Sequence, residues 1–318
     1  MREIGGYIEL DRYAGAMFHE KGLKLNSGRS ALAYVIKAKG IKKILMPKFM
    51  CDACDRVLEE NDVSVRYYSI GQDFKPAEQI GRDRAEDEWI FLVNFYGQIS
   101  GEDIKSVGSR VICDNAQAYF SEPVAGTDTL YTCRKYFGVP DGAILYTDAG
   151  MKEKLPQDES FERMRFLLGR FERGASEFYQ EYVENNRFFA GEPIKRMSKL
   201  TENLLRGIDY EFVKQRRTEN FKYLHERLAE KNKLTLTVPT GAFMYPLYIE
   251  NGEKVRKFLQ KENMYIPVLW PAVYKVCREG DLEYDMAKNI LPLPVDQRYG
   301  TEDMEYLISG IRRGIKHV

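Results

Sequence analysis

The stretch Thr132-Cys-Arg-Lys-Tyr-Phe-Gly-Val-Pro-Asp-Gly142 places a lysine, Lys135, in a short connection between two strand-like runs. Residues 129–132 and 143–147 flank the connection and are rich in β-branched and aromatic residues, whereas Val-Pro-Asp-Gly is typical of a turn. Lys135 is therefore expected to leave the end of a strand. A lysine in a connection is usually a solvated surface residue. One that is held at the end of a buried strand can instead serve as a nucleophile, if desolvation or a cationic neighbour such as Arg134 favours its neutral form.

Apolar runs alternate with helical patterns through the first half of the chain. The pattern predicts a helix over residues 51–60 and strands at residues 42–46, 63–70, 89–94 and 110–113. Repeated strand, helix, strand order implies right-handed crossovers and an α/β fold, with a mostly parallel sheet that carries helices on both faces. Ligands of such sheets bind beyond the carboxyl ends of the strands.

The second half of the chain predicts a smaller unit. Its pattern indicates helices at residues 161–189, 210–229, 254–261 and 301–316, of which the first is long and highly charged. Three strand-like runs lie at residues 234–238, 243–249 and 290–294. We therefore expect a large domain over residues 1–212 and a small C-terminal α/β domain over residues 213–318.

Composition restricts the classes of partner. The 318 residues carry 48 basic and 48 acidic side chains, so no global charge favours nucleic acid or an anionic membrane. The N-terminus lacks the apolar core of a signal peptide, and no run approaches the roughly 18 apolar residues that span a bilayer. We expect a cytoplasmic protein whose partners are small molecules or protein subunits.

The cysteines leave one alternative open. Cys51 and Cys54 form a C-x-x-C pair, which occurs in zinc and redox sites. A structural zinc site needs a second pair of ligands, and the other cysteines and histidines show no paired spacing. Ordinary small residues at a helix start are the favoured interpretation, and no metal is expected.

A small-residue loop opens a predicted helix in Leu25-Asn-Ser-Gly-Arg-Ser-Ala-Leu32. Gly28 allows the backbone to approach a ligand closely, and the free amides at the helix start, together with Arg29 and Ser30, are suited to hold a phosphate. The alternative is that Ser-Gly simply caps the helix.

A carboxylate ends another predicted strand in Val111-Ile-Cys-Asp-Asn-Ala-Gln-Ala118. Asp114 either caps a helix or faces the ligand edge of the sheet. Together with Lys135 and the Gly28 loop it completes the set that a pyridoxal phosphate enzyme needs: a phosphate cup, an acid beside the pyridine nitrogen, and a lysine for the Schiff base.

The Gly28 loop, the Asp114 strand end and the Lys135 connection follow one another in this order along the chain. In this order the chain resembles the pyridoxal-phosphate-dependent sugar aminotransferases of the DegT/DnrJ/EryC1/StrS family over nearly its whole length. Ser-Gly-Arg-Ser-Ala-Leu is similar to the family's Ser-Gly-Thr-x-Ala-Leu, Cys-Asp-Asn-Ala-Gln-Ala to its Glu-Asp-x-Ala-Gln-Ala, and Arg-Lys-Tyr-Phe-Gly-Val-Pro-Asp-Gly-Ala to its lysine block. The resemblance implies the aspartate aminotransferase fold, known as fold type I of the pyridoxal phosphate enzymes.

The resemblance also implies roles for residues. Lys135 would carry pyridoxal 5'-phosphate and move the substrate proton, Asp114 would stabilise the protonated pyridine nitrogen, and Gln117 would lie against the ring. The substrates would be an amino-acid donor such as glutamate and a nucleotide-linked keto sugar, in amino-sugar or surface polysaccharide biosynthesis. The active site would lie at the boundary of a homodimer, with the aromatic-rich residues 161–189 supplying apolar contact surface.

Two positions depart from the family pattern. Where members have a phosphate-binding serine, this chain has Leu130, and Thr132 is the candidate substitute. Where members have an aromatic residue that stacks on the cofactor, this chain has Cys51, so Phe49 or another ring would have to cover it. These departures keep two alternatives open: a degenerate or non-transaminating pyridoxal phosphate protein, and a non-enzymatic binding protein of the same fold.

Overall fold

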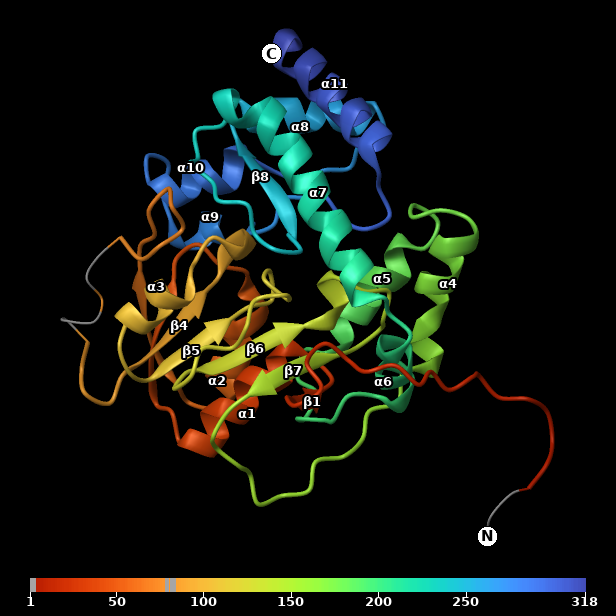
Figure 1. The fold of residues 1–318 in the computed structure, drawn as a ribbon. Coiled ribbons are helices and arrows are strands. Elements are labelled where there is room, and N and C mark those ends of the chain that lie inside the picture. The colour runs from red at the N-terminus through yellow and green to blue at the C-terminus, as the bar shows by residue number, and fades with distance from the viewer. Residues whose placement is uncertain (1–3, 78–79, 81–83) are drawn as a thin grey trace.

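A seven-stranded sheet forms the centre of the larger part of the molecule (Figure 1). The structure, a computed structural model, describes residues 4–77, 80 and 84–318. The strand order is β1-β7-β6-β5-β4-β2-β3. The strands are β1 (Leu23–Leu25), β2 (Lys43–Pro47), β3 (Ser64–Tyr68), β4 (Trp89–Val93), β5 (Val111–Asp114), β6 (Asp128–Thr132) and β7 (Ala143–Tyr146).

The prediction of a mostly parallel sheet is confirmed. Strands β3, β2, β4, β5 and β6 pair in parallel, whereas β7 runs antiparallel to both β6 and β1. The reversal at β7 follows from the short connection 133–142, because a parallel crossover needs a dozen or more residues. Gly142 closes this connection with φ +117°, a conformation that L side chains rarely adopt.

Helix α1 (Gly28–Lys39) lies against the sheet together with α2 (Asp55–Glu60), which follows a short 3-10 turn, η1 (Asp52–Cys54) (Figure 1). The Ser27 hydroxyl caps α1 by accepting from the main-chain N–H of Ser30, and Gly40 ends the helix in the left-handed region. The apolar face of α1 is buried on the sheet and contains Ala31, Leu32, Val35 and Ile36. This packing fixes the amino end of α1 at the carboxyl edge of the strands.

The prediction of one continuous helix over residues 161–189 is wrong. The segment forms η4 (Phe161–Met164), α4 (Arg165–Glu172) and α5 (Tyr179–Phe188), with a break at residues 173–178. The break contains Gly174 and Ser176, which are weaker helix formers than alanine. Helices α4 and α5 then pack on each other so closely that a Cβ on Gly169 would lie 2.3 Å from the Phe178 ring.

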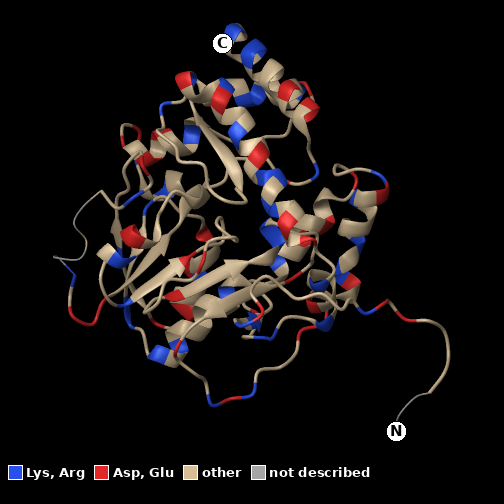
Figure 2. Ribbon diagram, in the orientation of Figure 1, with Lys and Arg blue, Asp and Glu red and all other residues tan. Residues whose placement is uncertain are grey.

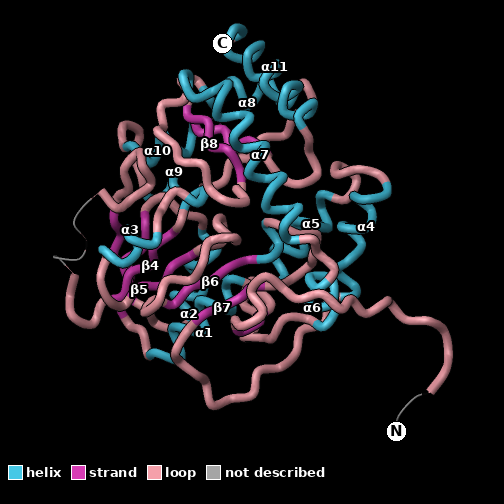
Figure 3. The backbone as a smooth tube through the Cα atoms, viewed as in Figure 1, coloured by secondary structure: helices cyan, strands magenta, loops and turns pink. Residues whose placement is uncertain are grey.

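A second, two-stranded antiparallel sheet stands apart from the first (Figure 3). It pairs β8 (Met244–Tyr248) with β9 (Ile290–Pro294). Residue 212, at the predicted domain boundary, lies in the first turn of α7. The remaining elements are η2 (Phe95–Gly97), α3 (Gly101–Ser106), η3 (Cys133–Lys135), α6 (Lys199–Arg206), α7 (Tyr210–Leu228), η5 (Ala229–Lys231), α8 (Gly252–Lys261), α9 (Val273–Val276), α10 (Leu282–Asn289) and α11 (Thr301–His317).

The strand predicted over residues 234–238 is wrong. Its main chain bonds to side chains in place of a neighbouring strand, with Leu234 N donating to Asn232 Oδ1 and Thr237 N to Gln98 Oε1. Leu234 and Leu236 are nevertheless buried. The alternating apolar pattern therefore records burial and not strand pairing.

The charged residues are spread over the chain. Figure 2 shows basic and acidic residues interspersed along the ribbon, in line with the formal net charge of zero. None of the helices in the described part of the chain has both the length and the apolar composition needed to cross a membrane.

Candidate functional site

Lys135 and Asp114 lie beyond the carboxyl ends of two adjacent parallel strands. Asp114 is the last residue of β5, and Lys135 ends η3, the turn that follows β6. Burial raises the pKa of Asp114, and the nearby positive charge of Lys135 opposes that shift. The structure therefore brings the predicted lysine and the predicted acid within electrostatic reach of each other.

Lys135 is exposed, so the end of the buried strand β6 does not remove its side chain from water. Its Nζ lies 5.5 Å from the centre of the Phe243 ring, which belongs to the segment leading into β8. The neighbouring Arg134 donates to the Asn186 side chain on α5. An exposed lysine side chain near a half-buried carboxylate is accessible to a ligand.

The helix-capping alternative for Asp114 is wrong. The residues after it form turns, and its Oδ1 accepts from the main-chain N–H of Ala116 at 2.8 Å, closing a local turn. Oδ2 has no hydrogen-bond donor among the described residues. This oxygen is therefore left to accept from a ligand cation or N–H.

Gln117 supports the same edge of the sheet. It is buried, and its Oε1 accepts from the main-chain N–H of Tyr96 at 2.9 Å. Tyr96 has φ 53°, an unusual conformation for a residue with a side chain. The bond from Gln117 stabilises this strained turn after β4, and contact of Gln117 with a cofactor ring stays a prediction.

The amino end of α1 touches the end of β6. A Cβ on Gly28 would lie 2.9 Å from Thr132 Cγ2, which explains why glycine stands there. The Thr132 hydroxyl is buried and lacks a hydrogen-bond partner among the described residues. The place where Gly28 and Thr132 meet, called the recess below, therefore offers an unused hydroxyl donor of the kind that a phosphate cup requires.

Ser30 has a structural bond of its own. Its hydroxyl donates to Asn26 Oδ1 at 2.6 Å, and its main-chain N–H donates to Ser27 Oγ at 3.1 Å. Within the described ranges, the main-chain N–H groups of Gly28 and Arg29 find no acceptor, and they are the free amides at the start of α1. Ser30 therefore shapes the loop, and direct binding of a ligand by its hydroxyl would need these bonds to rearrange.

The two departures from the family pattern remain visible in the structure. Leu130 is 3% exposed and belongs to the core, so it offers no contact to a phosphate. Cys51 is half-buried at the start of η1. The Phe49 ring is fully buried among Phe74, Phe95 and Trp270, so the expectation that it covers a cofactor is wrong for this conformation.

The Arg29 side chain is half-buried and bonds to the main chain of two other segments. Its Nε donates to the main-chain oxygen of Ala53 at 3.0 Å, and its Nη1 to that of Asn186 at 3.4 Å. The side chain thus spans from the first turn of α1 to the C-x-x-C segment and to α5. It lies beside the recess at Gly28.

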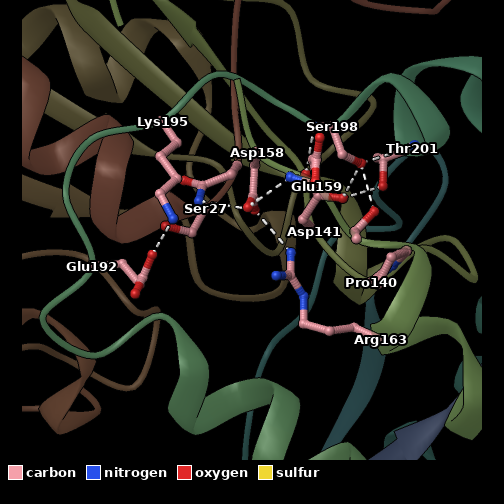
Figure 4. A network of polar contacts seen from close by, with 12 residues as sticks. Ser27, Pro140, Asp141, Asp158, Glu159, Arg163, Glu192, Lys195, Ser198 and Thr201 are labelled. Carbon is pink, nitrogen blue, oxygen red and sulfur yellow. Dashed lines mark hydrogen bonds and ion pairs between the residues drawn. The ribbon is translucent and has the colours of Figure 1, made fainter. Parts of the chain in front are cut away.

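Asp141, in the turn after Lys135, forms a buried network that the sequence analysis did not identify (Figure 4). Its carboxylate accepts from the Ser198 main-chain N–H at 2.8 Å, from the Ser198 hydroxyl at 2.7 Å and from the Thr201 hydroxyl. Burial raises the pKa of Asp141 and these bonds oppose the shift. They fasten the turn to the start of α6.

A second buried carboxylate, Asp158, joins that turn to the phosphate recess (Figure 4). It accepts from Asn26 Nδ2 at 3.1 Å and from Arg163 Nη2 at 2.8 Å. The Asn26 main-chain oxygen accepts from Gly142 N at 2.6 Å. Asn26 therefore holds the loop before α1 and the end of the lysine connection in one arrangement.

Cys51 and Cys54 lie at the two ends of η1. The five cysteines are free, and the described ranges contain no group of three His, Cys, Asp or Glu side chains that could hold a metal ion. Burial, the neighbouring Cys51 and Asp114 all raise the pKa of the Cys54 thiol. The Cys54 thiol is therefore held in its neutral form.

A separate open pocket of about 480 Å³ lies next to α3, and Lys135, Gly28 and Thr132 are not among the residues that line it. Its lysine, Lys105, is paired with Glu102 at 2.7 Å. Asn94 and Asn115 line its floor, and Asn94 Nδ2 donates to Asn115 Oδ1 at 3.1 Å. Nothing in it matches the chemistry of the Lys135 site.

Comparison with known proteins finds similarity in structure only. No family model matches the chain, and no curated protein matches it in sequence. Among solved structures, a DegT DnrJ EryC1 StrS aminotransferase from Brucella abortus is similar, with a TM-score of 0.62, 16% identity, and coverage of 91% of this chain and 84% of that one. DesV from S. venezuelae, in complex with a ketimine intermediate, has a TM-score of 0.64, 17% identity and coverage of 92% and 84%.

A third similar structure is the putative sugar aminotransferase Spr1654 from Streptococcus pneumoniae in its PLP-form, with a TM-score of 0.66, 13% identity and coverage of 93% and 87%. At such low identity the shared property is the fold, extending over more than nine tenths of this chain. The chain therefore has the fold of the DegT, DnrJ, EryC1 and StrS sugar aminotransferases.

Proposed function

We propose that this protein is a pyridoxal-phosphate-dependent aminotransferase that moves an amino group from an amino acid to a keto sugar. The observation that supports it most is the Lys135 and Asp114 pair at the carboxyl ends of β6 and β5, next to the recess at Gly28 and Thr132. The shared fold agrees with it, and several similar structures are named as sugar aminotransferases.

The residues present fit the cofactor. The free amides of Gly28 and Arg29 and the unpaired Thr132 hydroxyl would hold its phosphate, and Asp114 Oδ2 would accept from its ring nitrogen. Lys135 would attach it covalently. When bound, pyridoxal phosphate supplies an electron sink that stabilises negative charge on the carbon bearing the transferred amino group.

The chain's own residues supply the proton transfer and the positioning. Lys135 Nζ takes up and releases the substrate proton, because it is exposed to the site and held beside the Phe243 ring. Asp114 would balance the charge of a positively charged partner, since opposite charges favour each other's charged forms. The networks at Asp141 and Asp158 keep the lysine connection and the recess in fixed positions.

We further propose a homodimer of two-domain subunits, divided at residues 212 and 213, that works in the cytoplasm. Large apolar side chains are exposed on α4 and α5, with Phe171 at 92%, and along the N-terminal segment, with Tyr7 at 98%. Figure 1 shows that segment running away from the body of the subunit. Five free cysteines fit a reducing compartment. Light scattering that reports 37.0 kDa at micromolar concentration would contradict the dimer.

The test of the function is an absorbance titration. Purified protein mixed with pyridoxal phosphate should show a visible absorption band, and added glutamate should convert that band to the spectrum of the amine form of the cofactor. Lys135→Ala should lose both signals, whereas Lys152→Ala, at an exposed lysine on the loop after β7, should keep them. A band that no amino acid converts would favour a non-transaminating protein, and absence of any band would reject the function.

A further inference from the structure

Two guanidinium groups from different elements meet at Asn186 on α5. Arg29, in the first turn of α1, donates from Nη1 to the Asn186 main-chain oxygen at 3.4 Å. Arg134, the residue before Lys135, donates from Nη2 to Asn186 Oδ1 and stacks over the Phe189 ring, with Cζ 4.8 Å from the ring centre. The two side chains reach the same residue from the two segments that border the phosphate recess.

The positive charges of this pair are not neutralised by the chain. In the part of the chain that the structure describes, neither Arg29 nor Arg134 has a carboxylate oxygen within 4.0 Å, whereas the neighbouring Arg163 is paired with Asp158 at 2.8 Å. Burial, together with the charge of Arg29, lowers the pKa of Arg134 to about 10. Two like charges that are partly removed from water repel each other unless an anion lies between them.

The pair also keeps donors for a ligand. Arg29 Nη2 and Arg134 Nε and Nη1 have no hydrogen-bond partner among the described residues, and both side chains are half-buried. A guanidinium group offers parallel N–H donors that match the oxygens of a phosphate or a carboxylate. The amino end of the twelve-residue helix α1 adds a favourable dipole for negative charge.

We infer that Arg29 and Arg134 together bind an oxyanion, a phosphate or a carboxylate, beside the amino end of α1. For the identity of that anion the inference rests on the proposed function, which supplies two sources: the cofactor's phosphate and the carboxylate of the amino donor. The phosphate is favoured because Leu130 replaces the serine of the related pattern, and an arginine pair beside Gly28 and Thr132 compensates for the lost hydroxyl donor.

Calorimetric titration of the apoprotein with inorganic phosphate tests the site directly. Arg29→Gln and Arg134→Gln should each weaken phosphate binding about tenfold or more, the loss expected for a hydrogen bond to a charged group. Arg165→Gln is the matched control, because it removes the same charge from an exposed position on the nearby helix α4. It should bind phosphate as the unmodified protein does.

Two further titrations identify the source of the anion. If the site holds the cofactor's phosphate, both variants should lose affinity for pyridoxal phosphate but not for pyridoxal, which lacks the phosphate. If it holds the donor's carboxylate, affinity for pyridoxal phosphate should be unchanged, and binding of glutarate to the loaded protein should be lost. Either outcome supports the site.

The inference is overturned if the unmodified apoprotein binds phosphate no better than a variant that carries both Arg29→Gln and Arg134→Gln, and if glutarate binding is equally unaffected by the two changes. Thermal melting would show whether Arg134→Gln folds. If it does not, Arg134→Lys, which keeps the positive charge, and Arg29→Gln, which lies at a helix start, still test whether the two arginines bind phosphate. Phosphate binding that depends on both arginines, in a protein that never reacts with pyridoxal phosphate, would keep the anion site and reject the proposed function.

Discussion

The Arg217 guanidinium donates from Nη2 to the main-chain oxygen of Tyr136 at 3.1 Å, so a helix of the C-terminal part holds the residue that follows Lys135. The same buried side chain donates from Nη1 to the Ala242 main-chain oxygen at 3.0 Å, and from Nε to Gln297 Oε1 at 2.8 Å. Arg217 therefore links α7, the segment before β8 and the lysine connection. It acts as a positioning residue for Lys135.

Replacing Arg217 by glutamine should loosen this arrangement. Several carbonyl oxygens would lose a charged donor, and we expect the free energy of unfolding to fall by about 2–3 kcal/mol. Borohydride trapping of pyridoxal phosphate on Lys135 should also slow, a readout that a purely structural loss far from the site would not change. Gln297→Ala is the graded control, because it removes one of the two bonds to the Tyr136 oxygen. Equal trapping rates in all three proteins would contradict the positioning role.

Thr132→Val tests the recess at the end of β6. The hydroxyl has no partner among the described residues, so exchanging it for a methyl group should leave thermal stability unchanged or slightly raised. Affinity for pyridoxal phosphate should fall about tenfold if the hydroxyl binds the phosphate. The affinity is measured by titrating the protein with pyridoxal phosphate and recording the absorbance at equilibrium. Unaltered affinity would show that Thr132 does not bind the phosphate.

Leu130→Ser asks whether the family's serine can be restored. Leu130 is buried in the core, so serine there leaves a cavity and a buried hydroxyl, at a cost of about 2–5 kcal/mol in stability. No gain in cofactor affinity is expected. Denaturant unfolding and a cofactor titration check the two statements, and a tighter cofactor would show that position 130 can reach the phosphate after all.

Asp114→Asn should separate binding from chemistry. Asparagine keeps the shape and can still accept from the Ala116 N–H, so the fold should survive. It cannot balance the positive charge of a protonated ring nitrogen, so turnover should fall about a hundredfold or more. Steady-state kinetics with the cofactor fully bound give the answer, and unchanged turnover would leave Asp114 with only its turn-forming role.

His19 should make stability depend on pH. Burial lowers its pKa from 6.5 to about 4, despite a hydrogen bond to the Tyr119 oxygen that opposes the shift. Between these values the unfolded chain binds a proton that the folded chain does not. The free energy of unfolding should therefore fall as pH drops from 6.5 to 4, by up to about 3 kcal/mol, and level off below. Denaturant titrations across this range should show the slope, and His19→Gln should flatten it; an equal slope in both would contradict the assignment.

Buried strands could be predicted from the sequence, since their apolar runs are continuous and bounded by turns. This holds for β2, β4 and β5, and the carboxyl ends of parallel strands then located Asp114 and Lys135 at one edge. The strand predicted at residues 234–238 failed because burial of alternate residues arises without strand pairing. The single helix predicted at residues 161–189 failed because charge and aromatic content do not reveal where two short helices fold back on each other.

The supporting residues of the site could not be predicted, because their partners are distant in the chain. Asn26 bonds to Asp158, 132 positions away, and Arg217 bonds to Tyr136, 81 positions away. Arg217 stands in no local pattern that indicates a ligand, and the Gly28 loop, which contains Asn26, gives no sign of the Asp158 partner. Asp141 is an intermediate case: the Asp-Gly turn was evident, but the burial of its carboxylate against Ser198 depends on the tertiary fold.

Covalent labelling tests the central claim, that Lys135 carries the cofactor, most directly. Protein mixed with pyridoxal phosphate is reduced with borohydride, digested and mapped by mass spectrometry. We predict a single modified peptide containing Lys135, because this lysine stands at the strand end beside Asp114 and is exposed to the site. Modification of a different lysine, or scattered labelling of surface lysines at equal levels, would contradict the account.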